Sequence, residues 1–126
     1  MKLSKNLDDS EIRCKCGCGL NKISDLTVQK FQNARDFAGF PFIVTSGCRC
    51  PKYNKKIGGV ANSAHTPNAK GICQAIDIAF KDSTQCFFIV KGLILAGVKR
   101  IGINFDKHFI HFDTDSTKPQ NVLFKY

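Results

Sequence analysis

The chain has 126 residues and a mass of 14.0 kDa, a size typical of one domain built around a single hydrophobic core. Hydrophobic residues make up 43% and charged residues 23% of the sequence, which is the composition of an ordinary globular domain. The longest apolar run, at residues 86–98, is interrupted by Lys91 and is too short to cross a bilayer. We therefore expect no membrane partner.

The net charge of +9 and the pI of about 9.4 favour a polyanionic partner, either nucleic acid or an anionic bacterial surface. The basic residues are scattered, and the chain has no run of lysine and arginine of the kind that marks a nucleic-acid-binding arm. We therefore expect no nucleic-acid partner. A basic nucleic-acid binder stabilised by its cysteines is the distant alternative.

Residues 1–13 are polar, and we expect a flexible or lightly docked N-terminal arm before a single domain at residues 14–126. The arm contains no apolar stretch of the kind that defines a secretory signal peptide. Synthesis in a reducing cytoplasm is expected, where structural disulfides are uncommon and most of the seven cysteines would be free thiols.

Three cysteines alternate with other residues at Cys14, Cys16 and Cys18, so an extended backbone would place their sulfur atoms on one side. Gly17 and Gly19 permit a tight turn at this point. Structural zinc sites usually take two ligands separated by two to four residues, and C-x-C-x-C differs from that spacing. The sequence favours buried packing thiols and leaves a second metal or a redox role open.

Apolar residues at helical spacing predict an amphipathic helix over residues 25–38, which Gly39 ends. A second helix is predicted from Asp82 or Ser83, with its end at Gly97. β-Branched and apolar runs predict the strands, at residues 42–47, 74–80, 98–104 and 108–114. Because this order is not a βαβ alternation, the predicted fold class is α+β, a small antiparallel sheet with flanking helices.

Each of the three histidines lies in a polar or acidic motif. Strand alternation places His111 and Asp113 on one face of their strand. Asp77 lies inside the apolar strand AIDIA, where a carboxylate without a partner would be strongly unfavourable. With His65 from the preceding loop, these residues offer two imidazoles and one carboxylate, the ligand set of a catalytic zinc site. A set of satisfied structural residues is the alternative.

These motifs, in this order, resemble the M15 zinc peptidases of the hedgehog/D-Ala-D-Ala peptidase fold, and most closely their short phage and bacterial branch. The resemblance covers nearly the whole chain, through CKCGCG, SGCRCPKYN, S-x-H, A-x-D, RIGI, FIHFDTD and KPQNV. It implies one Zn²⁺ held by His65, Asp77 and His111. It also implies that the N-terminal cysteines pack against the region of Cys48 and Cys50.

The resemblance further assigns Arg49, in the SGCRC motif, to the substrate or the developing oxyanion, with a surface salt bridge as the alternative. A guanidinium suits that role because it stays charged and offers a fork of donors. Ser63 is expected to steady the ligand loop by hydrogen bonding, and Asp113 to orient a ligand.

Two features depart from the family pattern. The interval between His65 and Asp77 is longer than the family's H-x-x-G-x-A-x-D, and Cys73 stands where that pattern has glycine. The acid that many members carry shortly before the last ligand, as general base, is replaced by His108. A histidine can act as a base near neutral pH, and Asp106 in the preceding turn is the alternative.

The function that the resemblance implies is zinc-dependent hydrolysis of a peptide bond in peptidoglycan stem peptides, of the D-Ala-D-Ala carboxypeptidase or endolysin type, by a monomer. The alternative is a non-catalytic zinc-containing cell-wall-binding module on the same fold, which the missing acid favours and the arginine disfavours. With no signal peptide in the sequence, access to the wall is expected after release by phage lysis or from a virion.

Overall fold

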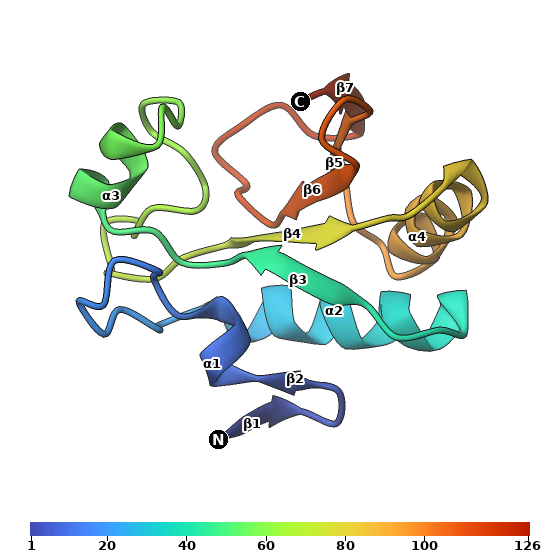
Figure 1. Ribbon diagram of the computed structural model, residues 1–126, viewed down its shortest axis with the longest axis horizontal. Helices are drawn as coiled ribbons and strands as arrows, with labels where there is room; N and C mark the ends of the chain where they lie inside the picture. Colours follow the sequence, from blue (N-terminus) through green and yellow to red (C-terminus); the bar gives the residue numbers. More distant parts are fainter.

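The computed structural model describes residues 1–126 and confirms the α+β class (Figure 1). A small hairpin and a short helix come first. They are β1 (Lys2–Ser4), β2 (Leu7–Asp8) and α1 (Asp9–Ile12). The main elements follow: α2 (Asp25–Ala38), β3 (Ile43–Ser46), α3 (Pro51–Lys56), β4 (Ala75–Ala79), α4 (Ser83–Leu95), β5 (Arg100–Asn104), β6 (Phe109–Asp113) and β7 (Val122–Lys125). None of the helices is long and apolar enough to span a membrane.

Five strands form the main sheet in the order β3-β4-β6-β5-β7. The first four pair antiparallel, as predicted, whereas β7 runs parallel to β5. The parallel pair follows from the topology. Because β6 and β5 are antiparallel neighbours, β6 ends beside the start of β5, and the chain then passes β5 to begin β7 at the same end.

The two long helices pack against each other and cover one face of the sheet (Figure 1). They bury Val28, Phe31 and Ala34 from α2 and Ile89 and Leu93 from α4. The strands meet them with fully buried side chains, namely Ile76, Ile78, Ile110 and Phe112. The residues between these point to the opposite face, which leaves that face free for polar side chains.

The N-terminal residues pack against the rest of the domain. Leu7 and Ile12 are fully buried in the main core, and the amide of Cys48 donates to the Ile12 carbonyl at 2.8 Å. Gly47 permits this approach, because a Cβ at that position would lie 2.6 Å from the Ile12 backbone. Leu7 and Ile12, together with the partly buried Leu3 that packs against the same core, attach residues 1–13 to the domain.

Candidate metal centre

The three predicted zinc ligands come together although they lie far apart in the sequence. Asp77 and His111 are cross-strand neighbours in β4 and β6, on the sheet face away from the helices. His65 lies in the loop between α3 and β4, and the Gln74 amide donates to the Ala64 carbonyl to hold that loop to the start of β4. Two strands and one tethered loop therefore build the site.

The donor atoms of the three residues converge on one point. His65 Nε2 and His111 Nδ1 each lie 3.0 Å from Asp77 Oδ1, and the two nitrogens are 3.1 Å apart. A tetrahedral zinc ion with bonds of about 2.0–2.1 Å would separate its ligand atoms by roughly 3.3 Å. The exposed fractions are 0% for His65, 2% for Asp77 and 3% for His111, so the geometry is that of a preformed buried donor set.

In each imidazole one nitrogen faces Asp77 and the other faces away from it. The hydrogen bond of the nitrogen that faces away determines whether the nitrogen beside Asp77 is free to bind a cation. His65 Nδ1 lies 2.6 Å from the Gly47 carbonyl oxygen, which can only accept, so this nitrogen carries the proton. His111 Nε2 likewise faces Asp113 Oδ2 at 2.7 Å. In the neutral rings both inner nitrogens are then bare lone pairs that face a carboxylate oxygen. Three acceptors so close together fit a divalent metal.

The surroundings of the two histidines shift their pKa values in opposite directions. Burial lowers the pKa of His65 by more than the opposing Asp77 raises it. Burial also acts against a charge on His111, but its hydrogen bonds with Asp113 and Asp77 outweigh that effect and raise its pKa. For Asp77, burial is outweighed by the two imidazoles, which hold its pKa below its ordinary value. The carboxylate is thus ionised and available to a cation.

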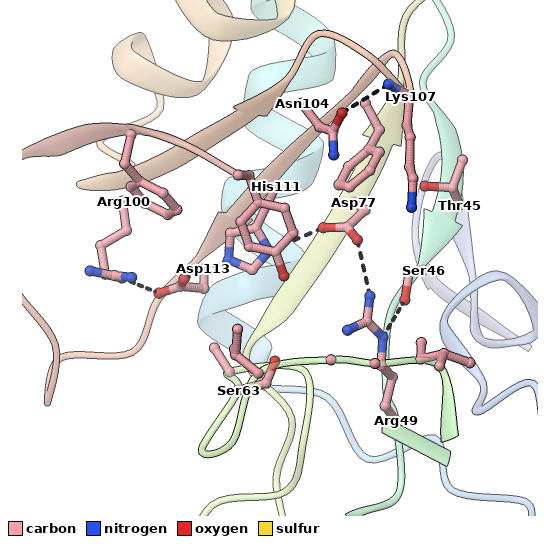
Figure 2. A pocket seen from close by; sticks show the side chains of 18 of the residues that line it. Thr45, Ser46, Arg49, Ser63, Asp77, Arg100, Asn104, Lys107, His111 and Asp113 are labelled. Atoms are coloured by element: carbon pink, nitrogen blue, oxygen red, sulfur yellow. Dashed lines mark hydrogen bonds and ion pairs between the residues drawn. The ribbon is translucent and has the colours of Figure 1, made fainter. Parts of the chain in front are cut away.

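Asp113 orients His111, as the sequence predicted, and is itself held on its other oxygen. Arg100 Nε donates to Asp113 Oδ1 at 2.8 Å, and the Asp115 amide donates to the same oxygen at 3.1 Å (Figure 2). Ser63 also has its expected position, since its Oγ accepts from the His65 amide at 3.1 Å. Both side chains therefore fix a ligand by direct contact.

Arg49 points toward Asp77 from the loop after β3 (Figure 2). Its Nη2 lies 3.4 Å from Asp77 Oδ2, its Nε donates to Ser46 Oγ at 3.1 Å, and its Nη1 donates to Asn54 Oδ1 at 3.2 Å. Only 8% of the residue is exposed, so it is not in a surface salt bridge. Asn54 belongs to the SGCRCPKYN motif, but its role as a support for Arg49 was not predicted.

The sequence analysis did not identify Tyr126, which covers His111. The two rings stack with centroids 4.3 Å apart and an angle of 10° between their planes. Burial raises the pKa of the Tyr126 hydroxyl to about 12. Gly102, which pairs with His111 across the sheet, makes room for the strand, because a Cβ there would lie 3.0 Å from that of Tyr126.

Asp77 and His111 line an open cavity of about 620 Å³, whereas the fully buried His65 is not part of its lining. Six cationic side chains line this cavity, namely Lys15, Arg49, Arg100, Lys107, Lys118 and Lys125. The acidic side chains in its lining are Asp77 and Asp113, and both are engaged in hydrogen bonds or ion pairs. The cavity therefore presents excess positive charge to a ligand.

The structure does not bring the two predicted general bases to this cavity. His108 is exposed at the turn between β5 and β6, with a φ of 57°, and its ring stacks on Phe80 at a centroid distance of 5.2 Å. Asp106 is exposed in the same turn. The cavity lining takes Asn104, Lys107 and Phe109 from this region and neither of these residues.

Fold and site together define a metallopeptidase-type centre, two histidines and an aspartate beside a substrate-sized cavity. The family model described as Peptidase M15 matches residues 5–113, which include all three ligands and Asp113. The chain therefore belongs to the M15 peptidase family, whose members are zinc-dependent metallopeptidases. A comparison with curated proteins gave no match. Tyr126 lies beyond the matched residues.

Proposed function

We propose that this protein hydrolyses a peptide bond in peptidoglycan stem peptides, as a D-Ala-D-Ala carboxypeptidase or an endopeptidase of endolysin type. The observation that carries the proposal is the lining of the cavity, where six cationic side chains accompany Asp77 and His111 of the buried His/Asp/His donor set. Stem peptides bear several free carboxylates, and such groups are attracted to clustered lysine and arginine side chains. The proposal includes a monomer that reaches the wall after release from the cell.

His65, Asp77 and His111 would hold the zinc ion, in agreement with their donor geometry. When bound, zinc polarises the scissile carbonyl and lowers the pKa of a water molecule to about 7. Arg49 and Tyr126 both line the cavity, and each would donate to the oxygen on which negative charge develops. Because the pKa of Tyr126 is about 12, its hydroxyl keeps the proton that this role requires.

The alternative is a non-catalytic zinc-containing wall-binding module. The placement of His108 and Asp106 outside the cavity lining favours it, because neither is then in reach of a reacting water. The buried arginine in the cavity favours the enzyme, since a wall-binding module with a structural zinc would not require a cation beside the metal.

The deciding experiment measures zinc content and the release of peptides from purified cell wall in the same preparations. His65→Ala, Asp77→Ala and His111→Ala should each lose one zinc equivalent and all release. Asp36→Ala, which removes an exposed carboxylate from α2, is the control and should retain both. If the His111 variant kept its full zinc content, the ligand assignment would be wrong. Full zinc content without peptide release in the unmodified protein would favour the binding module.

A further inference from the structure

A second group of metal-binding side chains lies at the N-terminal end of the domain, in Cys14, Cys16, Cys18 and Cys50. Their four sulfur atoms all lie within 4.8 Å of one another. The Sγ atoms of Cys14 and Cys16 are 3.4 Å apart, and those of Cys16 and Cys50 are 3.6 Å apart. This cluster shares no residue with the His65, Asp77 and His111 centre.

These separations fit a metal ion better than disulfides. A disulfide requires sulfur atoms at about 2.05 Å, and all seven cysteines of the chain are free thiols. Four thiolates around a tetrahedral zinc ion, with bonds of about 2.3 Å, would lie roughly 3.8 Å apart. Both of the sulfur–sulfur distances given above are close to that value.

Two of the four cysteines are exposed, so packing in the core does not explain why the four lie together. Cys48, Cys73 and Cys86 are buried and behave as packing thiols. Cys16 and Cys18 are exposed, so they fill no space in the core. A reason other than burial is therefore required for their approach to Cys14 and Cys50.

The backbone around the cluster supports sulfur atoms with negative charge. The Cys50 amide donates to Cys14 Sγ at 3.3 Å, and the Tyr53 amide donates to Cys50 Sγ at 3.4 Å. The Cys14 amide donates to the Leu20 carbonyl at 2.8 Å and closes a compact loop. Gly17 adopts a φ of 86° in this loop, which turns the flanking cysteines toward one side.

We propose that Cys14, Cys16, Cys18 and Cys50 form a structural zinc site with four thiolate ligands. Such a site is closed and leaves no position open for catalysis. The neighbours of the four cysteines indicate which segments such a site would join. Cys50 directly follows Arg49, while Lys15 donates to the Thr45 carbonyl of β3. The metal would clamp the N-terminal loop to the segment that presents Arg49 to the cavity.

Cobalt(II) substitution of the full chain tests this site separately from the catalytic one. Thiolate ligation produces sulfur-to-cobalt charge-transfer absorption in the near ultraviolet, which histidine and carboxylate ligands do not. The unmodified protein and His111→Ala should both show this absorption, with two metal ions and one per chain respectively. Cys16→Ser combined with Cys18→Ser should lose it and retain one metal. Cys86→Ala removes a thiol outside both groups and should match the unmodified protein.

Thiol reactivity of the unmodified zinc-loaded protein tests the same site without any substitution. Cys16 and Cys18 are exposed, so they should react quickly if free and slowly if they bind zinc. The seven thiols should all become reactive after unfolding with a chelator. Rapid reaction of the exposed pair, absence of the charge-transfer band, or a disulfide within the four would each overturn the proposal. Absence of peptide release from the unmodified protein, with the band intact, would count against the catalytic assignment alone.

Discussion

Arg49 is fixed by a different acceptor at each of the three nitrogens that carry its donors. Ser46 and Asn54 bind Nε and Nη1, while Nη2 lies beside Asp77, and almost none of the residue is exposed. A lysine has one compact charge on a flexible stem and cannot satisfy these acceptors together. The guanidinium is therefore held in one orientation beside the ligand carboxylate before any substrate arrives, which is the preorganisation that oxyanion stabilisation requires.

The general base is the residue role most open to test. His108 and Asp106 lie outside the cavity lining, so we expect His108→Ala and Asp106→Asn to change turnover by less than about tenfold and to retain zinc. Removal of a working base costs on the order of 10²–10⁴-fold. His108→Phe is the matched control, since it keeps a ring against Phe80. A loss of about 100-fold in His108→Ala and His108→Phe, with zinc retained, would restore His108 as the base and imply that the turn rearranges.

At the scale of elements, β7 does more than extend the sheet. It pairs with β5 and carries Phe124 and Tyr126 beside His111, with ring centroids at 6.1 Å and 4.3 Å from the imidazole. Arg100, which holds Asp113, lies over the Phe124 ring at 5.1 Å. The strand thereby covers one ligand and the side chains that orient it, and it excludes water from that side of the centre.

Substitution of Tyr126 separates the two contributions of this strand. Tyr126→Phe keeps the ring on His111 and removes the hydroxyl from the cavity lining, so we expect normal zinc affinity and a fall in kcat on the order of 10²-fold. Tyr126→Ala also removes the stacking ring and should weaken zinc binding, measured by competition with a chelator. Equal activity of Tyr126→Phe and the unmodified protein would show that the hydroxyl takes no part in catalysis.

The sequence predicted those helices and strands that have a clear periodicity or a recognisable end. The helix at Asp25–Ala38 has its apolar spacing and its glycine cap at Gly39, and β4 and β6 have their β-branched and aromatic residues. The short helix α3 was missed because its six residues are mostly polar and show no periodicity. The parallel pairing of β7 was missed because it depends on the order of the strands in the sheet.

Part of the candidate site could likewise be predicted from the sequence, and part could not. Alternation within β6 was enough to place His111 and Asp113 on one face. The carboxylate inside the apolar strand AIDIA and the polar loop before it indicated Asp77 and His65, and the resemblance then implied that both bind zinc with His111. The stack of Tyr126 on His111 could not be predicted, because it requires β7 to lie next to Gly102. The resemblance predicted that the N-terminal cysteines pack against the region of Cys48 and Cys50, and Cys50 does lie beside Cys14 and Cys16.

At the scale of the whole molecule, the net charge is positive, and the lining of the cavity is positively charged as well. The chain carries +9, and six of its cationic side chains line the cavity beside only two carboxylates. A substrate with several carboxylates would be attracted first by the net charge and then by the cavity itself. The two contributions differ in range, and salt screens the long-range one most strongly.

Salt dependence should therefore distinguish attraction by the whole surface from recognition in the cavity. As ionic strength rises from about 0.15 M to 1 M the screening length falls from about 8 Å to 3 Å, so kcat/KM for purified cell wall should fall, chiefly through KM. Lys107→Gln with Lys125→Gln removes two charges from the cavity rim and should raise KM at moderate salt and reduce its salt dependence. Lys2→Gln with Lys5→Gln removes the same charge from the N-terminal hairpin, away from the cavity, and is the matched control. Equal effects of the two pairs would mean that only net charge attracts the wall, and a flat salt profile in the unmodified protein would remove charge from the account of substrate choice.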